Sequence, residues 1–495
     1  MGPKRLALRL AAAPALVALA LLAACAAVID APLAHAASGD WPPAWQDPPA
    51  QQPDFAVPSF EPPSANHCRR APTTREVPGG GQYGRSRGIA DDLAASSAEE
   101  RVARKAEAAK SLAAGAPAPA TAAVPTEREA ADVARQAPPP FPDRPRPRHE
   151  TVTAGMVDDN ADFGEYLAYR QRSAGLPVRE RDIAERYLLE VTDAAGRPVH
   201  DAEVAVQRAG RHEPVMWART DTGGRVWLHP RAFLAPEVAD RTLGVAVRKG
   251  SAWSRTTLVR GERAALQVRL GIPSIVQRPR LDLVFLVDAT GSMGDEIAKL
   301  KASMRAMSQQ IAQLPGQPDI CWGLVAYRDR GDAFLTRSHD FTDDLGAFQG
   351  VLARVQAGGG GDTPEALNEA LHETVHQLSW RRDAARLVVL VADAPPHLDY
   401  GGPQYDVDMQ AALAKGIKLF AVGASGLDPV GEYVYRQMAQ YTAGRFVFLT
   451  YKEASDPGSG PGTRTPHDVR GYSVQTLDRL IVRLVGDELA KLPRG

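Results

Sequence analysis

The chain has few cysteines and no excess of one charge. Its 495 residues include 3 cysteines, too few for a fold built on a disulfide framework. Cys321 stands beside Trp322 in an apolar run, so we predict that it is a small buried hydrophobic residue without a redox role. Lysine and arginine total 58 against 59 acidic residues and form no basic stripe, so we expect no nucleic-acid partner.

Long hydrophobic runs are absent beyond the N-terminus. A positively charged start is followed by an apolar run at residues 10–24 and by the small-residue pattern Ala34-His35-Ala36. This order predicts a signal peptide over residues 1–36, and no later run is long enough to cross a bilayer. Residues 22–25 also resemble a bacterial lipobox, so a membrane-attaching lipid on Cys25 and cleavage after Ala36 are two alternatives. We therefore expect an exported protein, located in the periplasm, on the cell surface or outside the cell.

Bulky apolar residues are scarce between residues 37 and 150. Tracts of proline and alanine dominate this region, and such a composition cannot bury enough surface to offset the entropy lost on ordering. We predict a disordered Pro/Ala-rich linker over residues 37–150. Apolar residues such as Phe163 and Tyr166 then return, and they predict a short helical connecting segment over residues 151–183.

Apolar and polar residues alternate from residue 184 to residue 271. Pairs such as Leu189 and Val191 are separated from the next pair by turn signals rich in Asp, Gly and Pro. Short alternating strands of this kind predict an all-β sandwich. Residues 191–199 and 218–226 resemble the carboxypeptidase-regulatory or transthyretin-like module, and that resemblance implies a structural or adhesive role.

Strands and helices alternate from residue 280 to residue 450. Apolar residues recur at three- and four-residue spacing between Ile297 and Leu314, which predicts a helix after the strand at residues 281–287. Further strands are predicted at residues 321–327, 386–392, 418–422 and 445–449. The alternation predicts an α/β fold with a doubly wound, mostly parallel, Rossmann-like sheet. Residues 451–495 predict a loop and a C-terminal amphipathic helix that docks on this domain.

Acidic and hydroxyl side chains stand at the ends of these strands and before one helix. The residues concerned are Asp288, Thr290 and Ser292, then Asp362 and Thr363 after the glycines at 358–361, and then Asp393. Each group alone is also typical of a helix cap or turn, and their joint spacing favours a shared site. Ligands collect beyond the carboxyl ends of parallel strands, and carboxylates with hydroxyls suit magnesium. The sequence therefore predicts a magnesium site at this edge.

This set of residues resembles the metal-ion-dependent adhesion site of the von Willebrand factor type A (VWA) family. Asp288, Thr290 and Ser292 match the family's Asp-x-Ser/Thr-x-Ser element, and Asp393 matches its third element. The second element departs from the family's pattern, and either Asp362 or Thr363 takes the place of its threonine. The resemblance implies a bound Mg²⁺, with Mn²⁺ or Ca²⁺ as alternatives, whose coordination is completed by a Glu or Asp of a protein partner.

A competing motif lies in the same region. His372, Glu373 and His376 fit the HExxH pattern of zinc proteases. The apolar residues of the surrounding helix lie on one side, so we predict that both histidines face solvent on the other, and no further ligand stands at a recognisable spacing. We interpret the tripeptide at residues 330–332, Arg-Gly-Asp, as a polar loop. A phosphate-binding loop motif is absent, so nucleotide hydrolysis has no support.

Together these features predict a binding protein and not an enzyme. We expect an exported protein that engages a protein partner through a divalent cation at Asp288 and its neighbours. Two alternatives stay open, namely a zinc-dependent hydrolase that uses His372 and His376, and a structural envelope protein with a vestigial metal site.

Overall fold

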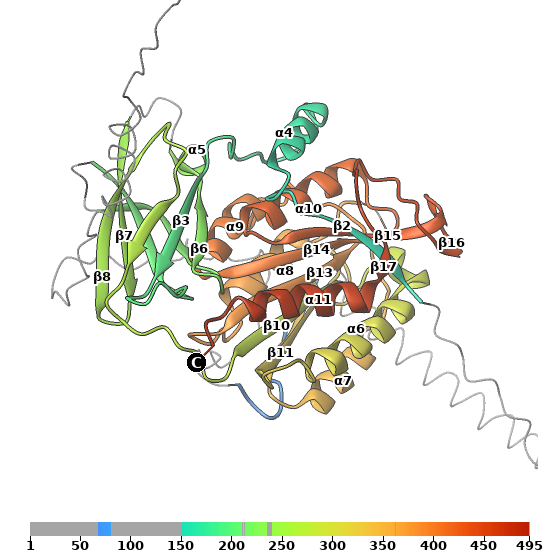
Figure 1. The fold of residues 1–495 in the computed structure, drawn as a ribbon. Coiled ribbons are helices and arrows are strands. Elements are labelled where there is room, and N and C mark those ends of the chain that lie inside the picture. Colours follow the sequence, from blue (N-terminus) through green and yellow to red (C-terminus); the bar gives the residue numbers. More distant parts are fainter. Residues whose placement is uncertain are drawn as a thin grey trace, which may run out of the picture.

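The computed structural model describes residues 68–80 and 151–494, apart from residues 210, 212, 235–239 and 362. The predicted signal peptide at residues 1–36, Cys25 and most of the predicted linker lie outside the described residues. Figure 1 shows a large sheet with helices on both sides and, beside it, two smaller sheets. Among the described helices, none combines the length and the apolar character needed to span a bilayer.

Five parallel strands form the centre of the large sheet, as the sequence predicted. They lie in the order β11, β10, β13, β14, β15. Their bounds are Asp319–Tyr327, Arg280–Asp288, Ala385–Ala392, Ile417–Gly423 and Arg445–Glu453. β10 is buried along its whole length after Arg280, which explains its nearly continuous apolar sequence. The mostly parallel α/β sheet of the prediction is therefore confirmed.

Antiparallel strands at the edges of this sheet were not predicted. β12 (Thr336–Thr342) and β1 (Thr74–Val77) extend the sheet beyond β11, while β2 (Thr153–Val157) and β17 (Gln475–Thr476) extend it beyond β15. A short strand, β16 (Asp456–Pro461), also pairs with β15. These short strands have weak local signals, and they are ordered by pairing with strands that are distant in sequence.

Two expectations about the segments before residue 184 are corrected by these pairings. Residues 74–77 lie in the region predicted to be disordered, yet they pair in register with β12. Residues 153–157 lie in the predicted helical connecting segment, yet they pair with β15. The helical part of that segment is α4 (Phe163–Arg172), which Asp162 caps by accepting a hydrogen bond from the amide of Glu165.

A disulfide attaches residues 68–80, here called the N-terminal strap, to the central sheet. Cys68 and Cys321 are bonded, with their Cα atoms 6.0 Å apart. The prediction that Cys321 is only a buried hydrophobic residue was therefore wrong. Its burial was anticipated correctly, but its partner lies 253 residues away in a segment that the composition assigned to disorder.

Removal of this disulfide is expected to lower the free energy of unfolding by about 2–4 kcal/mol, because the unfolded chain regains the freedom of a long closed loop. Urea unfolding of the oxidised protein, the dithiothreitol-reduced protein and a Cys68→Ser/Cys321→Ala variant measures this loss. The reduced protein and the variant should agree with each other. Equal stability of oxidised and reduced protein would contradict the prediction.

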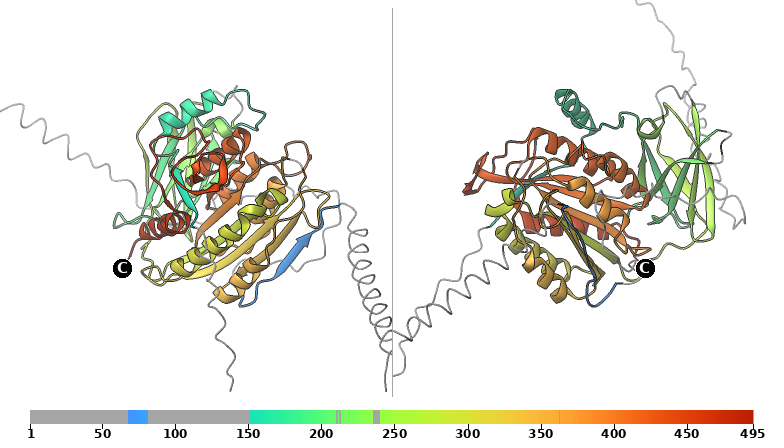
Figure 2. Two further views of the ribbon diagram at one scale, coloured as in Figure 1. Left: turned by 90° about the vertical axis from the view of Figure 1, so that its right-hand side faces the viewer. Right: turned by 180° about the vertical axis from the view of Figure 1, so that it is seen from behind.

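Helices cover both faces of the large sheet (Figure 2). The bounds of α6, α7 and α11, on one face, are Ile297–Ile311, Leu345–Arg354 and Leu477–Ala490. Those of α8, α9 and α10, on the other face, are Leu367–His376, Tyr405–Ala414 and Pro429–Tyr441. Alternate residues of β10 enter the two cores, since Phe285 packs with the α6 side and Leu286 with the α8 side. The predicted apolar stripe of α6 and the predicted C-terminal helix α11 are both confirmed.

The strands between residues 187 and 269 form two small sheets. One has the order β5-β4-β7-β8 and the other β6-β3-β9. Their bounds, in chain order from β3 to β9, are Tyr187–Thr192, Glu203–Arg208, Pro214–Arg219, Arg225–Leu228, Thr242–Lys249, Ala252–Val259 and Leu266–Arg269, with the short helix α5 (Pro230–Phe233) after β6. Leu189 of one sheet and Val204 of the other belong to one hydrophobic cluster with Met409 of α9. Trp217 of β5 and Ala414 of α9 form a further small cluster, so the sheet that contains β5 packs on α9.

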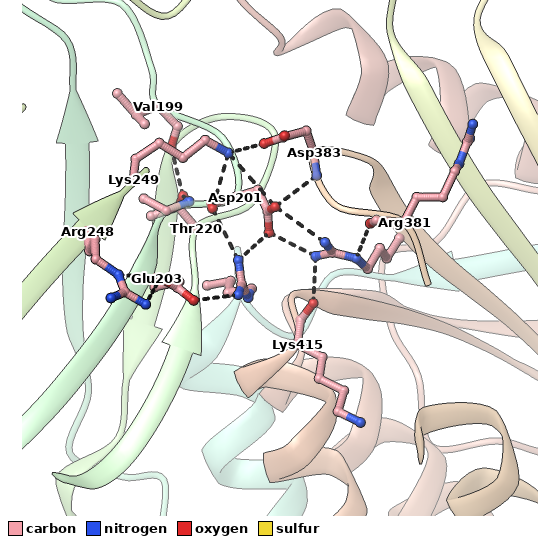
Figure 3. Close-up of polar contacts among 12 residues, drawn as sticks. Val199, Asp201, Glu203, Thr220, Arg248, Lys249, Arg381, Asp383 and Lys415 are labelled. Atoms are coloured by element: carbon pink, nitrogen blue, oxygen red, sulfur yellow. Dashed lines mark hydrogen bonds and ion pairs between the residues drawn. The ribbon is translucent and has the colours of Figure 1, made fainter. Parts of the chain in front are cut away.

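A buried ion cluster also joins the small sheets to the large one (Figure 3). Asp201, before β4, accepts hydrogen bonds from Arg386 of β13 at 2.8 Å, from Arg219 of β5 at 3.1 Å and from the backbone amide of Asp383 at 3.0 Å. The Lys249 ammonium lies 3.8 Å from the same carboxylate. Burial by itself raises the pKa of Asp201, but the charges of Arg386 and Arg219 outweigh it and hold this pKa far below its usual range.

Candidate metal centre

The candidate site lies where β10 and β13 end side by side. These parallel strands are paired in register up to Val287 and Val391, so Asp288 and Asp393 follow at the same edge of the sheet. The loop between α7 and α8, which contains the glycines at 358–361, reaches the same edge. The predicted convergence of these three loops is therefore observed.

The first loop folds around the carboxylate of Asp288. Asp288 Oδ1 accepts hydrogen bonds from the amide and the hydroxyl of Thr290, at 2.9 and 2.7 Å, and the Thr290 hydroxyl lies 3.1 Å from that of Ser292. The 3₁₀ helix η1 (Gly291–Asp295) begins directly after Thr290. Asp288 thus holds its own turn, as the helix-cap alternative requires. Its second oxygen, Oδ2, is buried and has no hydrogen-bond partner among the described residues.

Backbone hydrogen bonds tie the first loop to the glycine loop. The amide of Gly291 donates to the carbonyl of Gly359 at 2.9 Å, and the amide of Gly358 donates to Ala289 at 3.1 Å. Gly360 has a φ of 66°, and a Cβ at this position would lie 2.8 Å from Glu365 Oε1 and 3.2 Å from the Cβ of Thr290. A glycine is therefore needed at position 360, between the first loop and Glu365.

The assignment of Asp362 or Thr363 as the second-loop ligand stays a prediction. Asp362 lies outside the described residues, and Thr363 is exposed. The buried acid of this loop is Glu365, which sequence reasoning missed. The amide of Glu365 donates to the carbonyl of Pro395 at 3.0 Å, and its carbonyl accepts from the amide of His397 at 3.1 Å, so Glu365 also ties this loop to the one after β13. The Pro-Glu sequence after Thr363 was the available signal for Glu365 as a second-loop acid. The family pattern favoured a threonine or aspartate at this element instead.

The three acids of the cluster are buried close together. Burial, and then the charge of Asp393, raises the pKa of Asp288 to about 7. Burial, and then the charge of Asp288, raises the pKa of Glu365 to about 9. Burial also raises the pKa of Asp393, although a hydrogen bond from Ser292 opposes this. Mutual repulsion and loss of water thus both disfavour the charged forms of these carboxylates.

The donor set fits a divalent cation. Asp288, Glu365 and Asp393 each have a buried carboxylate oxygen without a hydrogen-bond partner in the described part of the chain, and the hydroxyls of Thr290 and Ser292 lie beside Asp288. Hard oxygen donors of this kind suit Mg²⁺, Mn²⁺ or Ca²⁺. A bound cation would offset the repulsion between the three carboxylates.

The Arg-Gly-Asp tripeptide at residues 330–332 contacts the glycine loop of the site. The carboxylate of Asp332 accepts hydrogen bonds from the amide of Gly360 at 2.8 Å and from that of Asp329 at 3.1 Å. The amide of Gly331 donates to the carbonyl of Gly79, in the N-terminal strap, at 2.7 Å. The tripeptide is thus a loop held by internal contacts, in agreement with its interpretation from the sequence.

Asp329 and His397 line the rim next to this loop. Asp329 is buried and accepts hydrogen bonds from the hydroxyl of Tyr400 at 2.8 and 2.9 Å. The ring of His397 stacks on Tyr400 with 3.7 Å between ring centroids, and its Nε2 lies 3.5 Å from Asp329. His397 is therefore packed into the rim and not an exposed loop residue.

The HExxH histidines do not face solvent, contrary to the prediction. His372 and His376 lie against α9, where both contact the carboxylate of Asp408, at 3.2 and 2.8 Å. The stripe argument failed because a second helix covers this side of α8. Glu373 points elsewhere and accepts a hydrogen bond from the hydroxyl of Ser338 at 2.7 Å. Since the glutamate is held away from both histidines, the arrangement of a zinc protease is not formed.

Comparison with known proteins assigns a family to the larger domain. The von Willebrand factor type A domain family matches residues 282–455. The alpha-protein kinase vwkA of Dictyostelium discoideum is 28% identical over 137 residues, which cover 28% of this chain and 22% of that protein. The putative ariadne-like RING finger protein R811 of Acanthamoeba polyphaga mimivirus is 33% identical over 119 residues, covering 24% of this chain and 11% of that protein.

A mammalian protein and one solved structure add to this comparison. The von Willebrand factor A domain-containing protein 7 of Rattus norvegicus is 36% identical over 93 residues, covering 19% of this chain and 10% of that protein. The chain thus spans at most 22% of the length of these curated relatives. Proximal thread matrix protein 1 from the mussel byssus aligns at 15% identity with a TM-score of 0.25, covering 34% of this chain and 47% of that one. The family match and the VWA-containing relative show that residues 282–455 of this chain are a VWA domain, a kind of domain that commonly mediates protein–protein interaction.

Proposed function

We propose that this protein is an exported binding protein that engages a protein partner through a divalent cation at the Asp288 centre. The cation would be held by Asp288, Thr290, Ser292 and Asp393, with Glu365 as the acid of the second loop. A Glu or Asp of the partner would complete its coordination. The protein needs no catalytic group for this role, and we propose that it is not an enzyme.

The observation that carries this proposal is the convergence of three buried carboxylates that each keep an oxygen without a hydrogen-bond partner among the described residues. An unpaired buried charge costs several kcal/mol, so a turn with only a structural role would not be expected to contain three such carboxylates. Ser292 and Thr363 are exposed at the rim, while Asp288 beneath them is fully buried. A cation bound there would have protein ligands on its inner side and remain open to a partner on its outer side.

The bond between Cys68 and Cys321 supports export. Disulfides persist in oxidising compartments and are rare in the cytosol of mesophiles. This agrees with the signal-peptide pattern at residues 1–36, where a lipid on Cys25 remains the alternative to cleavage after Ala36. We also propose that the two small sheets are the transthyretin-like sandwich and that they present the VWA domain to its partner.

The test combines metal binding with partner capture. Asp288→Ala and Asp288→Asn are expected to weaken Mn²⁺ binding at least about 100-fold, as loss of a direct charged ligand does. Calorimetric titration with MnCl₂ measures this. Pull-down from an envelope extract of the source organism, with MgCl₂ or with EDTA, should capture a partner only when metal is present, and neither Asp288 variant should capture it.

A matched control is Asp344→Ala, because Asp344 lies outside the metal centre and caps α7 by accepting from the amide of Ala347 at 2.9 Å. This variant should bind Mn²⁺ and the partner as the wild type does. Circular dichroism shows whether each variant is folded. Capture that is unchanged by EDTA and by both Asp288 substitutions would show that the metal-bridged mode is wrong.

A further inference from the structure

A second group of metal-ligating side chains lies between α8 and α9. His372 and His376 stand one turn apart on α8, and their rings stack with 4.3 Å between centroids. The Nδ1 atom of His372 lies 3.2 Å and the Nε2 atom of His376 lies 2.8 Å from Oδ1 of Asp408, which comes from the first turn of α9. One ligand atom from each of these three residues lies within 4.8 Å of the others.

The group is buried at the contact of the two helices and opens on one side. The side chains of Asp408, His376 and His372 are 2%, 4% and 14% exposed. The adjacent side of α8 packs Leu371 and Val375 into the core, so the helix is fixed in its rotation and directs both imidazoles at α9. An ion would enter past His372, the most exposed of the three.

We propose that His372, His376 and Asp408 form a zinc site, separate from the Asp288 centre. Two imidazole nitrogens and one carboxylate oxygen favour Zn²⁺ over Mg²⁺ or Ca²⁺, which prefer oxygen donors. Ligand atoms about 2.1 Å from a tetrahedral zinc ion lie about 3.4 Å apart. The observed separations of 2.8 and 3.2 Å need to widen by about 0.6 and 0.2 Å. A water molecule would take the fourth position, on the side of His372.

The histidine tautomers do not oppose metal binding. In the metal-free protein both imidazoles can donate a hydrogen bond to Asp408. The other ring nitrogen of His372, Nε2, is buried without a hydrogen-bond partner among the described residues. The hydrogen bond to Asp408 holds the proton of His372 on Nδ1 in the metal-free protein. Because zinc would bind that carboxylate in place of the proton donor, a shift of this proton to Nε2 would free the Nδ1 lone pair for zinc.

This zinc site would fasten the two helices that follow the loops of the Asp288 centre. Glu365 precedes the start of α8 by two residues, and the side-chain oxygen of Asn368 in α8 accepts a hydrogen bond from the amide of Tyr405, the first residue of α9, at 2.8 Å. His372 lies one turn beyond Asn368. The geometry thus points to a structural role, and Glu373, held by Ser338, provides no general base.

The test is a titration of the full-length protein with ZnCl₂. The protein carries the substitution Asp288→Asn and the buffer contains 5 mM MgCl₂, so that zinc binding at the Asp288 centre does not contribute. We expect one zinc ion per chain in calorimetry and a rise in Tm of about 5–10 °C at a zinc concentration 100 times Kd. The variants Asp408→Asn and His372→Gln/His376→Gln should weaken zinc binding at least about 100-fold, as loss of direct ligands does. His467→Gln is the matched control, because His467 also has a buried side chain beside a carboxylate, 3.0 Å from Glu432. This variant should bind zinc as the wild type does.

X-ray absorption of the zinc-loaded wild-type protein gives a readout that does not depend on the folding of a variant. It should show scattering from two imidazole ligands. Zinc bound only by oxygen ligands, equal binding by the wild type and the His372→Gln/His376→Gln variant, or no binding by the wild type would each overturn the proposal.

Discussion

Replacement of Asp201 by alanine is expected to lower the free energy of unfolding by about 3–5 kcal/mol, the usual effect of removing one partner from a buried ion pair. Asp201 is 3% exposed, and Arg386, which it neutralises, is 6% exposed. Without Asp201, the Arg386 guanidinium would keep only carbonyl acceptors, those of Arg381 and Lys415 at 2.9 and 2.7 Å. The buried cation would then lose the carboxylate bonded to it at the junction of the small sheets with the VWA domain, although the charges of Asp282 and Asp383 still act on it.

Asp201→Asn separates the loss of charge from the loss of backbone fit. Asp201 has a φ of 55°, a conformation that asparagine tolerates and alanine does not, so the alanine variant should be the less stable by about 1 kcal/mol. Glu203→Gln is the control, because Glu203 also pairs with Arg219 but is 27% exposed, and its removal should cost less than about 1 kcal/mol. Urea unfolding measures all three. If Asp201→Asn and Glu203→Gln are equally stable, the buried pair does not hold the junction.

The contribution of Asp201 to the free energy of unfolding should decrease at low pH. Its pKa in the folded protein is depressed, so its stabilising effect is complete well above pH 4 and is lost as the pH falls below the ordinary value of 3.8. The Asp201 variants should therefore differ most from the wild type at pH 7, and this difference should begin to narrow as the pH falls below 3.8.

Sequence reasoning succeeded where the signal is local. The central strands are apolar runs buried on both faces, and the stripe from Ile297 to Ile311 defines α6 without knowledge of its neighbours. The first loop was found for the same reason, since Asp288, Thr290 and Ser292 stand within five residues. Asp393 follows another such strand. In each case one short segment contains the periodicity or spacing that predicts the structure.

The missed features all depend on a partner that is distant in sequence. The strand at residues 74–77 exists because β12 offers it an edge, and Cys321 has a bonded partner because that strap is ordered. His372 faces α9 because residues 405–414 fold over it. Glu365 joins the metal centre through the backbone of the loop after β13. None of these pairings leaves a pattern within one segment, so the sequence alone did not reveal them.

The metal-free protein is expected to lose stability as the pH rises from about 4 to about 9. The pKa values of Asp288 and Glu365 are raised to about 7 and about 9, from ordinary values of 3.8 and 4.5. In this range the folded protein keeps protons that the unfolded chain has released, so stability falls with rising pH. The shift at Asp288 alone corresponds to about 4 kcal/mol, at 1.36 kcal/mol per pKa unit.

A divalent cation should remove this dependence. Mg²⁺ binds the deprotonated carboxylates, so the stabilisation that it provides should grow as the pH rises. Urea unfolding at pH 5, 7 and 9, in EDTA and in 5 mM MgCl₂, gives the two curves. They should nearly coincide at pH 5 and separate towards pH 9. A metal-free stability that is constant or increases over this range would contradict the clustering of Asp288, Glu365 and Asp393.

The substitution Glu365→Gln tests whether Glu365 is a ligand of the metal centre. The substitution keeps the size of the side chain and removes an acid that the folded protein must keep protonated at pH 8. The metal-free variant should therefore be more stable than the metal-free wild type at pH 8, by at least about 1 kcal/mol. Its Mg²⁺ affinity should fall at least about tenfold, because one negatively charged oxygen ligand is lost. Glu373→Gln removes another buried glutamate of raised pKa, one that contacts Ser338. If both variants bind Mg²⁺ as the wild type does, Glu365 only ties the loops together, and the second-loop ligand must come from Asp362 or Thr363.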